Sequence, residues 1–77
     1  NFNYEVKKVG EIISIRIQAL SFIYQLYIYC NNADGVFSNN FFDLLAGETI
    51  TTYFTPSEKS IDLKYDFSLN TAMDISI

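Results

Sequence analysis

Residues 11–30 read EIISIRIQALSFIYQLYIYC, and the pattern in this stretch decides the fold class. Apolar and polar side chains alternate through Glu11–Ala19 and again through Phe22–Cys30. A period of two is typical of β-strands, whose successive side chains point to opposite faces. β-Branched and aromatic residues dominate both halves and favour a pleated sheet over a helix. The stretch therefore predicts two paired strands, joined by a tight connection at Leu20 and Ser21.

A membrane-spanning helix is the alternative interpretation of the mostly apolar run from Ile12 to Cys30. Arg16 lies inside this run, and an arginine at the centre of a spanning helix costs about 2.5 kcal/mol or more. The two strands are therefore favoured, and their alternation assigns each side chain to a face. The side chains predicted to face the core are Ile13, Ile15, Ile17, Ala19, Tyr24, Leu26, Ile28 and Cys30. The opposite face of the second strand carries Ile23, Gln25, Tyr27 and Tyr29.

Turn residues divide the rest of the chain into further short, alternating stretches. Asn, Asp, Gly and Pro suit the backbone conformations of turns, and they cluster at Asn31–Gly35 and Pro56–Lys59. Gly47 is expected to have a positive φ before the strand that follows it. We expect further strands over residues 2–10, 36–37, 49–54, 61–67 and 71–77. Their predicted core-facing residues include Ile50, Thr52, Phe54, Ile61, Leu63, Tyr65 and Phe67.

About seven short strands without a helical period predict an all-β fold, an immunoglobulin-like antiparallel two-sheet sandwich. Residues 1–77 are expected to form this one domain, with a small barrel as the alternative. The chain has no Trp and one Cys, so the Cys–Trp–Cys pattern of antibody domains is absent. Because the first residue is Asn1 rather than Met, we expect the domain to be a piece of a larger protein.

Composition excludes several classes of function. The net charge is −4 and the five Lys and Arg are scattered, which argues against a nucleic-acid interface. The absence of His excludes Ser–His and Cys–His nucleophile pairs and His-ligated zinc. Cys30 is expected to be a small buried apolar side chain rather than a reactive thiol. We expect no catalytic, cofactor-binding or metal-binding residue; calcium at Asn31, Asn32 and Asp34 is the weaker alternative to turn chemistry.

Residues 37–48 read FSNNFFDLLAGE. This segment resembles a motif of the C-terminal immunoglobulin-like domain of β-mannosidase-type glycoside hydrolases, which reads Phe-Ser-Asp-Asn, an aromatic residue, then Phe-Asp-Leu-Leu-Pro-Gly-Glu. Asn39 stands where the motif has Asp, and Ala46 stands where it has Pro. Neither departure threatens the expected fold. The matching residues, to which we assign structural roles, are Phe37, Ser38, Asn40, Phe41, Phe42, Asp43, Leu44, Leu45, Gly47 and Glu48.

Each of these roles is expected from the chemistry of the side chain. Asp43 can accept hydrogen bonds from backbone N–H groups two residues on, in an Asx-type turn. Phe41 and Phe42 point to opposite faces if the backbone is extended, so that one reaches the core and the other a neighbouring domain. Ser38 and Asn40 can bond the turn backbone, and Leu44 or Leu45 can close the end of the sandwich.

The resemblance implies a non-catalytic C-terminal accessory domain that packs against and stabilises the other domains of a retaining β-mannosidase-like hydrolase. The two catalytic glutamates would then lie on a barrel domain outside these 77 residues. The implied partners are the other domains of the same chain, and carbohydrate is reached through the parent's active site or bound weakly. No cofactor, nucleic acid or membrane is implied. A bacterial parent would be soluble, and periplasmic or secreted.

The face that carries Ile23, Tyr27 and Tyr29 is the candidate interaction surface. Tyr is enriched at interfaces, so packing against a neighbouring domain of the parent is the favoured hypothesis. A carbohydrate-binding module that stacks sugar rings on exposed tyrosines is the first alternative. A surface interaction domain of the bacterial immunoglobulin-like type is the second.

Overall fold

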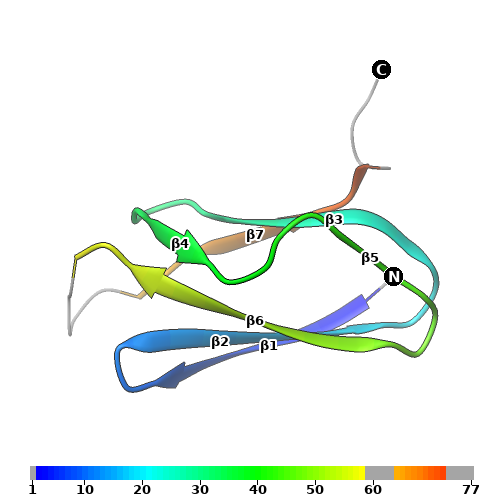
Figure 1. The fold of residues 1–77 in the computed structure, drawn as a ribbon, viewed down its shortest axis with the longest axis horizontal. Coiled ribbons are helices and arrows are strands. Elements are labelled where there is room, and N and C mark those ends of the chain that lie inside the picture. Colours follow the sequence, from blue (N-terminus) through cyan, green and yellow to red (C-terminus); the bar gives the residue numbers. More distant parts are fainter. Residues whose placement is uncertain (1, 59–63, 73–77) are drawn as a thin grey trace.

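The structure, a computed structural model, describes residues 2–58 and 64–72. Seven strands in these ranges form two antiparallel sheets (Figure 1). The four-stranded sheet has the order β1-β2-β6-β4, and the three-stranded sheet has the order β5-β3-β7. The strands are β1 (Phe2–Val9), β2 (Ile12–Ala19), β3 (Ile23–Cys30), β4 (Gly35–Phe37), β5 (Phe42–Leu44), β6 (Thr49–Pro56) and β7 (Phe67–Asn70). This arrangement confirms the predicted all-β, two-sheet sandwich.

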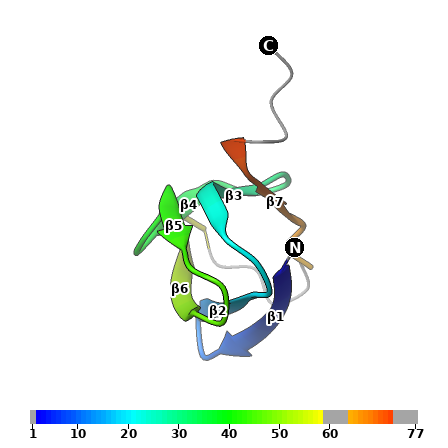
Figure 2. The same ribbon diagram turned by 90° about the vertical axis from the view of Figure 1, so that its right-hand side faces the viewer.

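The expected pairing of the strands in 11–30 is wrong, because β2 and β3 lie in different sheets. β2 pairs with β1 and β6, while β3 pairs with β5 and β7. The end-on view in Figure 2 shows the two sheets as facing layers. The last residue of β2, Ala19, exchanges hydrogen bonds of 2.9 Å with Gly47 and Glu48, so its backbone is already paired. Stacking across the core also buries the apolar faces of both strands at once.

The core lies between the sheets and is built largely from the residues that alternation assigned to it. Ile15, Ile17 and Leu26 are fully buried. The Phe54 ring from β6 lies at one end of this core, with its centroid 4.8 Å from that of Phe37 and 5.3 Å from that of Phe67. The buried apolar residues are Ile13, Ile15, Ile17, Ala19, Ile23, Leu26, Ile28, Cys30, Leu44 and Phe54.

At the start of β3, the inward-facing and outward-facing side chains are the reverse of those predicted. Ile23 is 2% exposed although the pattern placed it outside, and Tyr24 is 46% exposed although the pattern placed it in the core. The cause is Gln25, whose φ of 48° interrupts the register of β3 with β5 between Ile23 and Leu26. A residue in the left-handed region acts as a bulge, so the strand resumes with its faces exchanged.

The end of the described chain differs from the expected strands over 61–67 and 71–77. Residues 64–66 precede β7 and lie outside any strand, as do Thr71 and Ala72. Tyr65 and Phe67 pack against the core as predicted. The remaining expected residues of these two strands, Ile61, Leu63 and residues 73–77, lie outside the described ranges.

Candidate functional site

The segment 37–48 carries the chain from one sheet to the other. Phe37 ends β4 in the four-stranded sheet, and Phe42 begins β5 in the three-stranded sheet. Figure 1 shows this crossing as the green loop between the labels β4 and β5. Its side chains therefore bond to strands of both sheets.

Ser38 and Asn39 attach the crossing to β6 through the buried hydroxyl of Thr52. This hydroxyl donates to the Asn39 carbonyl over 2.8 Å, accepts from the Asn39 N–H over 3.1 Å, and lies 3.3 Å from the Ser38 hydroxyl. Ser38 Oγ also accepts from the Tyr53 N–H over 3.0 Å. Thr52 is fully buried, and these bonds satisfy its polar atom. The sequence placed Thr52 on the core face but did not identify it as the partner of the motif.

Asn40 attaches the same crossing to β3. Its Oδ1 accepts from the Ile28 N–H over 2.8 Å, and its Nδ2 donates to the Ile28 carbonyl over 2.8 Å. The side-chain amide thus makes both bonds that a backbone neighbour would make in a ladder. Asn40 Oδ1 also accepts from the N–H of Phe41, whose φ is 57°. Asn40 thus makes the expected bond to the turn backbone, at Phe41, and also bonds β3. The Ser38 hydroxyl bonds β6 instead of the turn backbone.

Asp43 has a partner other than the expected one. Its Oδ1 accepts from the Gln25 N–H over 2.8 Å, so it caps the bulge in β3 rather than folding back on its own turn. Leu44 is buried and Leu45 is exposed, which assigns the packing role to Leu44. Glu48 Oε1 accepts from the Leu45 N–H over 2.6 Å. Gly47, between them, has the predicted positive φ, at 89°.

Three side chains on the outer face of the three-stranded sheet form what we call the aromatic surface: Tyr27, Tyr29 and Phe41. The Tyr27 and Phe41 rings are stacked, with centroids 5.7 Å apart and an interplanar angle of 21°. Phe41 is 72% exposed and Tyr29 is 59% exposed. Ile23 is buried in the core, so its assignment to this surface is wrong. Phe42 packs against the core and Phe41 is exposed, as expected, but the backbone at Phe41 is left-handed rather than extended as the prediction assumed.

The turn after β3 uses its polar side chains to hold the segment that leads into β7. Asn31 Nδ2 donates to Asp66 Oδ2 over 3.1 Å and to Ser68 Oγ over 2.8 Å. Asn32 Nδ2 donates to the Lys64 carbonyl over 2.7 Å, and its Oδ1 accepts from the Asp66 N–H over 3.0 Å. These side chains therefore already have hydrogen-bond partners within the protein.

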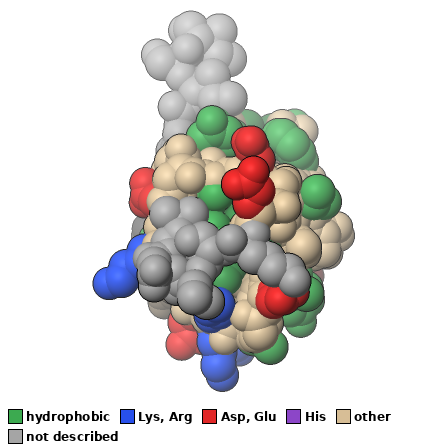
Figure 3. All heavy atoms as spheres, turned by 90° about the vertical axis from the view of Figure 1, so that its left-hand side faces the viewer, with side chains coloured by type: hydrophobic (Ala, Val, Ile, Leu, Met, Phe, Trp, Pro, Cys, Tyr) green, Lys and Arg blue, Asp and Glu red, His purple; other side chains and the backbone are tan. Residues whose placement is uncertain are grey.

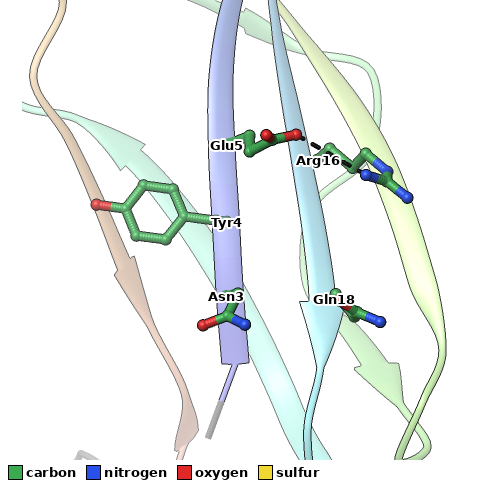
Figure 4. Close-up of a pocket in the computed structure, with 5 residues that line it drawn as sticks. All are labelled: Asn3, Tyr4, Glu5, Arg16 and Gln18. Carbon is green, nitrogen blue, oxygen red and sulfur yellow. Dashed lines mark ion pairs between the residues drawn. The ribbon is translucent and has the colours of Figure 1, made fainter.

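A shallow depression of about 220 Å³ lies over β1 and β2, mostly on the outer face of the four-stranded sheet (Figure 4). Its lining includes Glu5 and Arg16, which form an exposed ion pair of 3.8 Å. Such a pair contributes little, because water screens both charges. The five lining residues are Asn3, Tyr4, Glu5, Arg16 and Gln18.

The charged groups of the described ranges do not gather into a reactive site. Every Asp and Glu in residues 2–58 and 64–72 is exposed, and these ranges hold no group of three or more potential metal ligands. The end of the molecule in Figure 3 shows acidic side chains spread over the surface and basic ones toward one side. Cys30 is buried, as expected. No helix in the described part is long and apolar enough to cross a membrane.

The comparisons with known proteins agree with the fold. Residues 1–75 match the model of a family of Ig-fold domains that is named for mannosidases. Searches of curated proteins and of solved structures returned no match. The family match covers nearly the whole chain, including the crossing segment and both sheets. The chain therefore belongs to the mannosidase Ig-fold domain family.

Proposed function

We propose that the chain is a non-catalytic accessory domain of a β-mannosidase-like glycoside hydrolase. The aromatic surface is proposed to pack against another domain of that parent. Family membership supports the parent, and the exposure of Phe41 at 72% is the observation that carries the packing role. Removing apolar ring surface from water lowers the free energy, so burial of this surface against another domain would be favourable. The retaining reaction and its two glutamates belong to the parent's other domains in this proposal.

The surface is held in a shape suited to a fixed partner. Phe41 has a left-handed backbone conformation that a bulky residue adopts at a cost of about 1 kcal/mol or more. Asn40 offsets this cost, because it accepts from the Phe41 N–H while it also bonds Ile28. The Phe41 ring is thereby placed over Tyr27 before any partner arrives. Less side-chain freedom is then lost when the domains associate.

Carbohydrate binding is the second candidate, since the Tyr29 ring is 59% exposed. Tyr27 is a poorer platform than the sequence suggested, because Phe41 covers one face of its ring. The two functions are separated by titrating mannotriose into the ¹⁵N-labelled chain and recording amide shifts. The accessory role predicts no saturable shifts in residues 23–30. Saturable shifts there would replace it with a carbohydrate-binding role.

The packing role is tested in the parent enzyme. Tyr29→Ser is expected to lower the melting temperature of the parent by several degrees while kcat is unchanged. The matched control is Tyr53→Ser, which removes a similarly exposed ring from the outer face of the other sheet. Equal effects of the two variants would contradict a specific interface. Sequencing the reading frame around the chain tests the parent itself, because the proposal requires a barrel domain with two catalytic glutamates.

A further inference from the structure

The inner face of β1 is apolar but uncovered. Tyr4 and Val6 lie directly opposite Ile17 and Ile15 of β2, so all four side chains point to the same side of the sheet. Ile15 and Ile17 are fully buried, whereas Tyr4 is 51% and Val6 is 47% exposed. In the described ranges the three-stranded sheet does not extend over β1. A row of core-directed side chains therefore faces solvent.

The opening above this row is bordered by β7. Figure 2 shows β1 and β7 as edges on the same side of the sandwich. In Figure 4 the ring of Tyr4 points from β1 toward the side on which β7 lies, away from Arg16 and Gln18. β7 is the last strand in the order β5-β3-β7. A strand placed next to β7 would thus lie over Tyr4 and Val6.

The hydrogen-bond pattern shows which backbone groups of β7 face this opening. The Asn31 N–H donates to the Asp66 carbonyl over 2.8 Å, which makes this pair a hydrogen-bonded one. Antiparallel pairs alternate, so Ser68 and Asn70 bond to β3, while Phe67 and Leu69 direct their N–H and C=O groups outward.

An independent contact supports this assignment. Ile28, the partner of Leu69, uses its own N–H and C=O to bond Asn40 on the opposite side of β3. In residues 2–58 and 64–72, no hydrogen bond to the outward groups of Phe67 and Leu69 is present. β7 therefore has the donors and acceptors that an additional strand requires.

The charge beside the opening specifies the added strand further. Lys8 continues the inner-facing row of β1 and lies opposite Ile13, which in turn lies opposite Phe54. The Phe54 ring contacts Phe67, so Lys8 is at the level where β7 begins. An acidic side chain at that level would complement Lys8, next to apolar side chains over Val6 and Tyr4.

We propose that β7 and the inner face of β1 form an acceptor for one further β-strand. Its occupant is a segment of a partner polypeptide in extended conformation, with apolar side chains at alternate positions and an acidic one facing Lys8. The strand would pair its backbone with Phe67 and Leu69, and its side chains would cover Tyr4 and Val6. This is strand addition, in which backbone bonds give affinity and alternate side chains give specificity. It involves a different surface from the aromatic one, and it stands whether or not the parent is a mannosidase.

The test uses the 77-residue chain and an acetylated, amidated nonapeptide, Glu-Thr-Val-Thr-Val-Thr-Val-Thr-Glu. Its Val and Glu side chains share one face, so either direction of binding places a Glu near Lys8. Titration followed by NMR is expected to shift the amide protons of Phe67 and Leu69 downfield and to slow their exchange with solvent. The side-chain signals of Tyr4 and Val6 should shift with the same saturation curve. The same peptide with Pro at its central Val is expected not to bind.

Two pairs of variants locate the peptide. Leu69→Pro removes an outward N–H and leaves the bonds to β3, a position where an edge strand tolerates Pro. It is expected to weaken binding at least tenfold more than Leu69→Ala, which loses side-chain contacts but keeps the N–H. Val6→Lys places a charge under the peptide and should weaken its binding. The control Val9→Lys places a charge on the outer face of the same strand and should bind the peptide with the affinity of the original chain. This second pair keeps the test decisive if Leu69→Pro does not fold.

Three results would overturn the proposal. One is the absence of saturable shifts at Phe67 and Leu69, and another is equal binding by Val6→Lys and Val9→Lys. The third is protection of the same amides that rises with protein concentration in the absence of peptide, because a second copy of the chain would then be the occupant.

Discussion

Asn40 makes through its side chain the two hydrogen bonds that a further residue of β5 would make through its backbone. Thr52 makes the corresponding connection to the other sheet, with a hydroxyl that lies in an apolar core. Both side chains bond backbone groups that would be unpaired without them. At the scale of single residues, the crossing between the sheets depends on these two polar groups.

Replacing Asn40 by Ala should lower the free energy of unfolding by about 2 kcal/mol, because the N–H and C=O of Ile28 lose their partners. Urea denaturation of the chain measures this change. Asn39→Ala is the matched control, since Asn39 bonds Thr52 through its backbone. A loss for Asn40→Ala as small as that of the control would contradict the bridging role.

Thr52→Val keeps the shape of the side chain and removes the hydroxyl. We expect a loss of about 2 kcal/mol, because the backbone N–H and C=O of Asn39 lose their partner at a part-buried position. Thr51→Val, on the outer face of the same strand, should change stability by less than about 0.5 kcal/mol. Equal losses in the two variants would show that the hydroxyl of Thr52 is dispensable.

At the scale of elements, short β4 depends on its close approach to β6. Gly35 begins β4 opposite Pro56, and a Cβ at Gly35 would lie 2.5 Å from Cζ of Phe54 and 2.5 Å from the carbonyl oxygen of Thr55. Such distances require the backbone to move, since the carbonyl is part of the β6 ladder. Gly35 is therefore needed because its lack of a side chain lets β4 pack closely on β6, and not because the backbone there has a positive φ.

Gly35→Ala should destabilise the chain by about 2–3 kcal/mol through this overlap. Thermal unfolding followed by circular dichroism measures the effect. Gly10→Asn is the control, because Gly10 has open space around it and Asn tolerates its φ of 64°. If Gly35→Ala has the same melting temperature as the original chain, the distance between β4 and β6 is set by other contacts.

At the scale of the whole molecule, the strands of residues 2–58 and 64–72 form a four-stranded sheet that faces a three-stranded one, and this inequality leaves β1 partly uncovered. Side chains on one face of the four-stranded sheet thus differ in burial according to the strand that lies above them. Ile15 is fully buried and Val6, directly opposite it, is nearly half exposed.

Ile15→Thr should cost about 3 kcal/mol, because it removes buried apolar volume and buries a hydroxyl. Val6→Thr should cost less than about 0.5 kcal/mol in the isolated chain, because the side chain is already in contact with water. Urea denaturation of both variants tests the uncovered state of β1. A large loss for Val6→Thr would mean that β1 is covered in solution.

The sequence by itself determined where most strands lie, since a period of two is a local property of the chain. It also assigned the buried faces of β2 and β6 correctly, and the segment 37–48 indicated the family. Only the tertiary structure decided that β2 pairs with β6 rather than with β3, because pairing depends on contacts between distant residues. The exchanged faces of Ile23 and Tyr24 likewise depend on the bulge at Gln25, which Asp43 caps from 18 residues away. The exposure of Tyr4 and Val6 on β1 follows from the number of strands that the described residues contribute to the opposite sheet, and no local pattern in the sequence specifies that number.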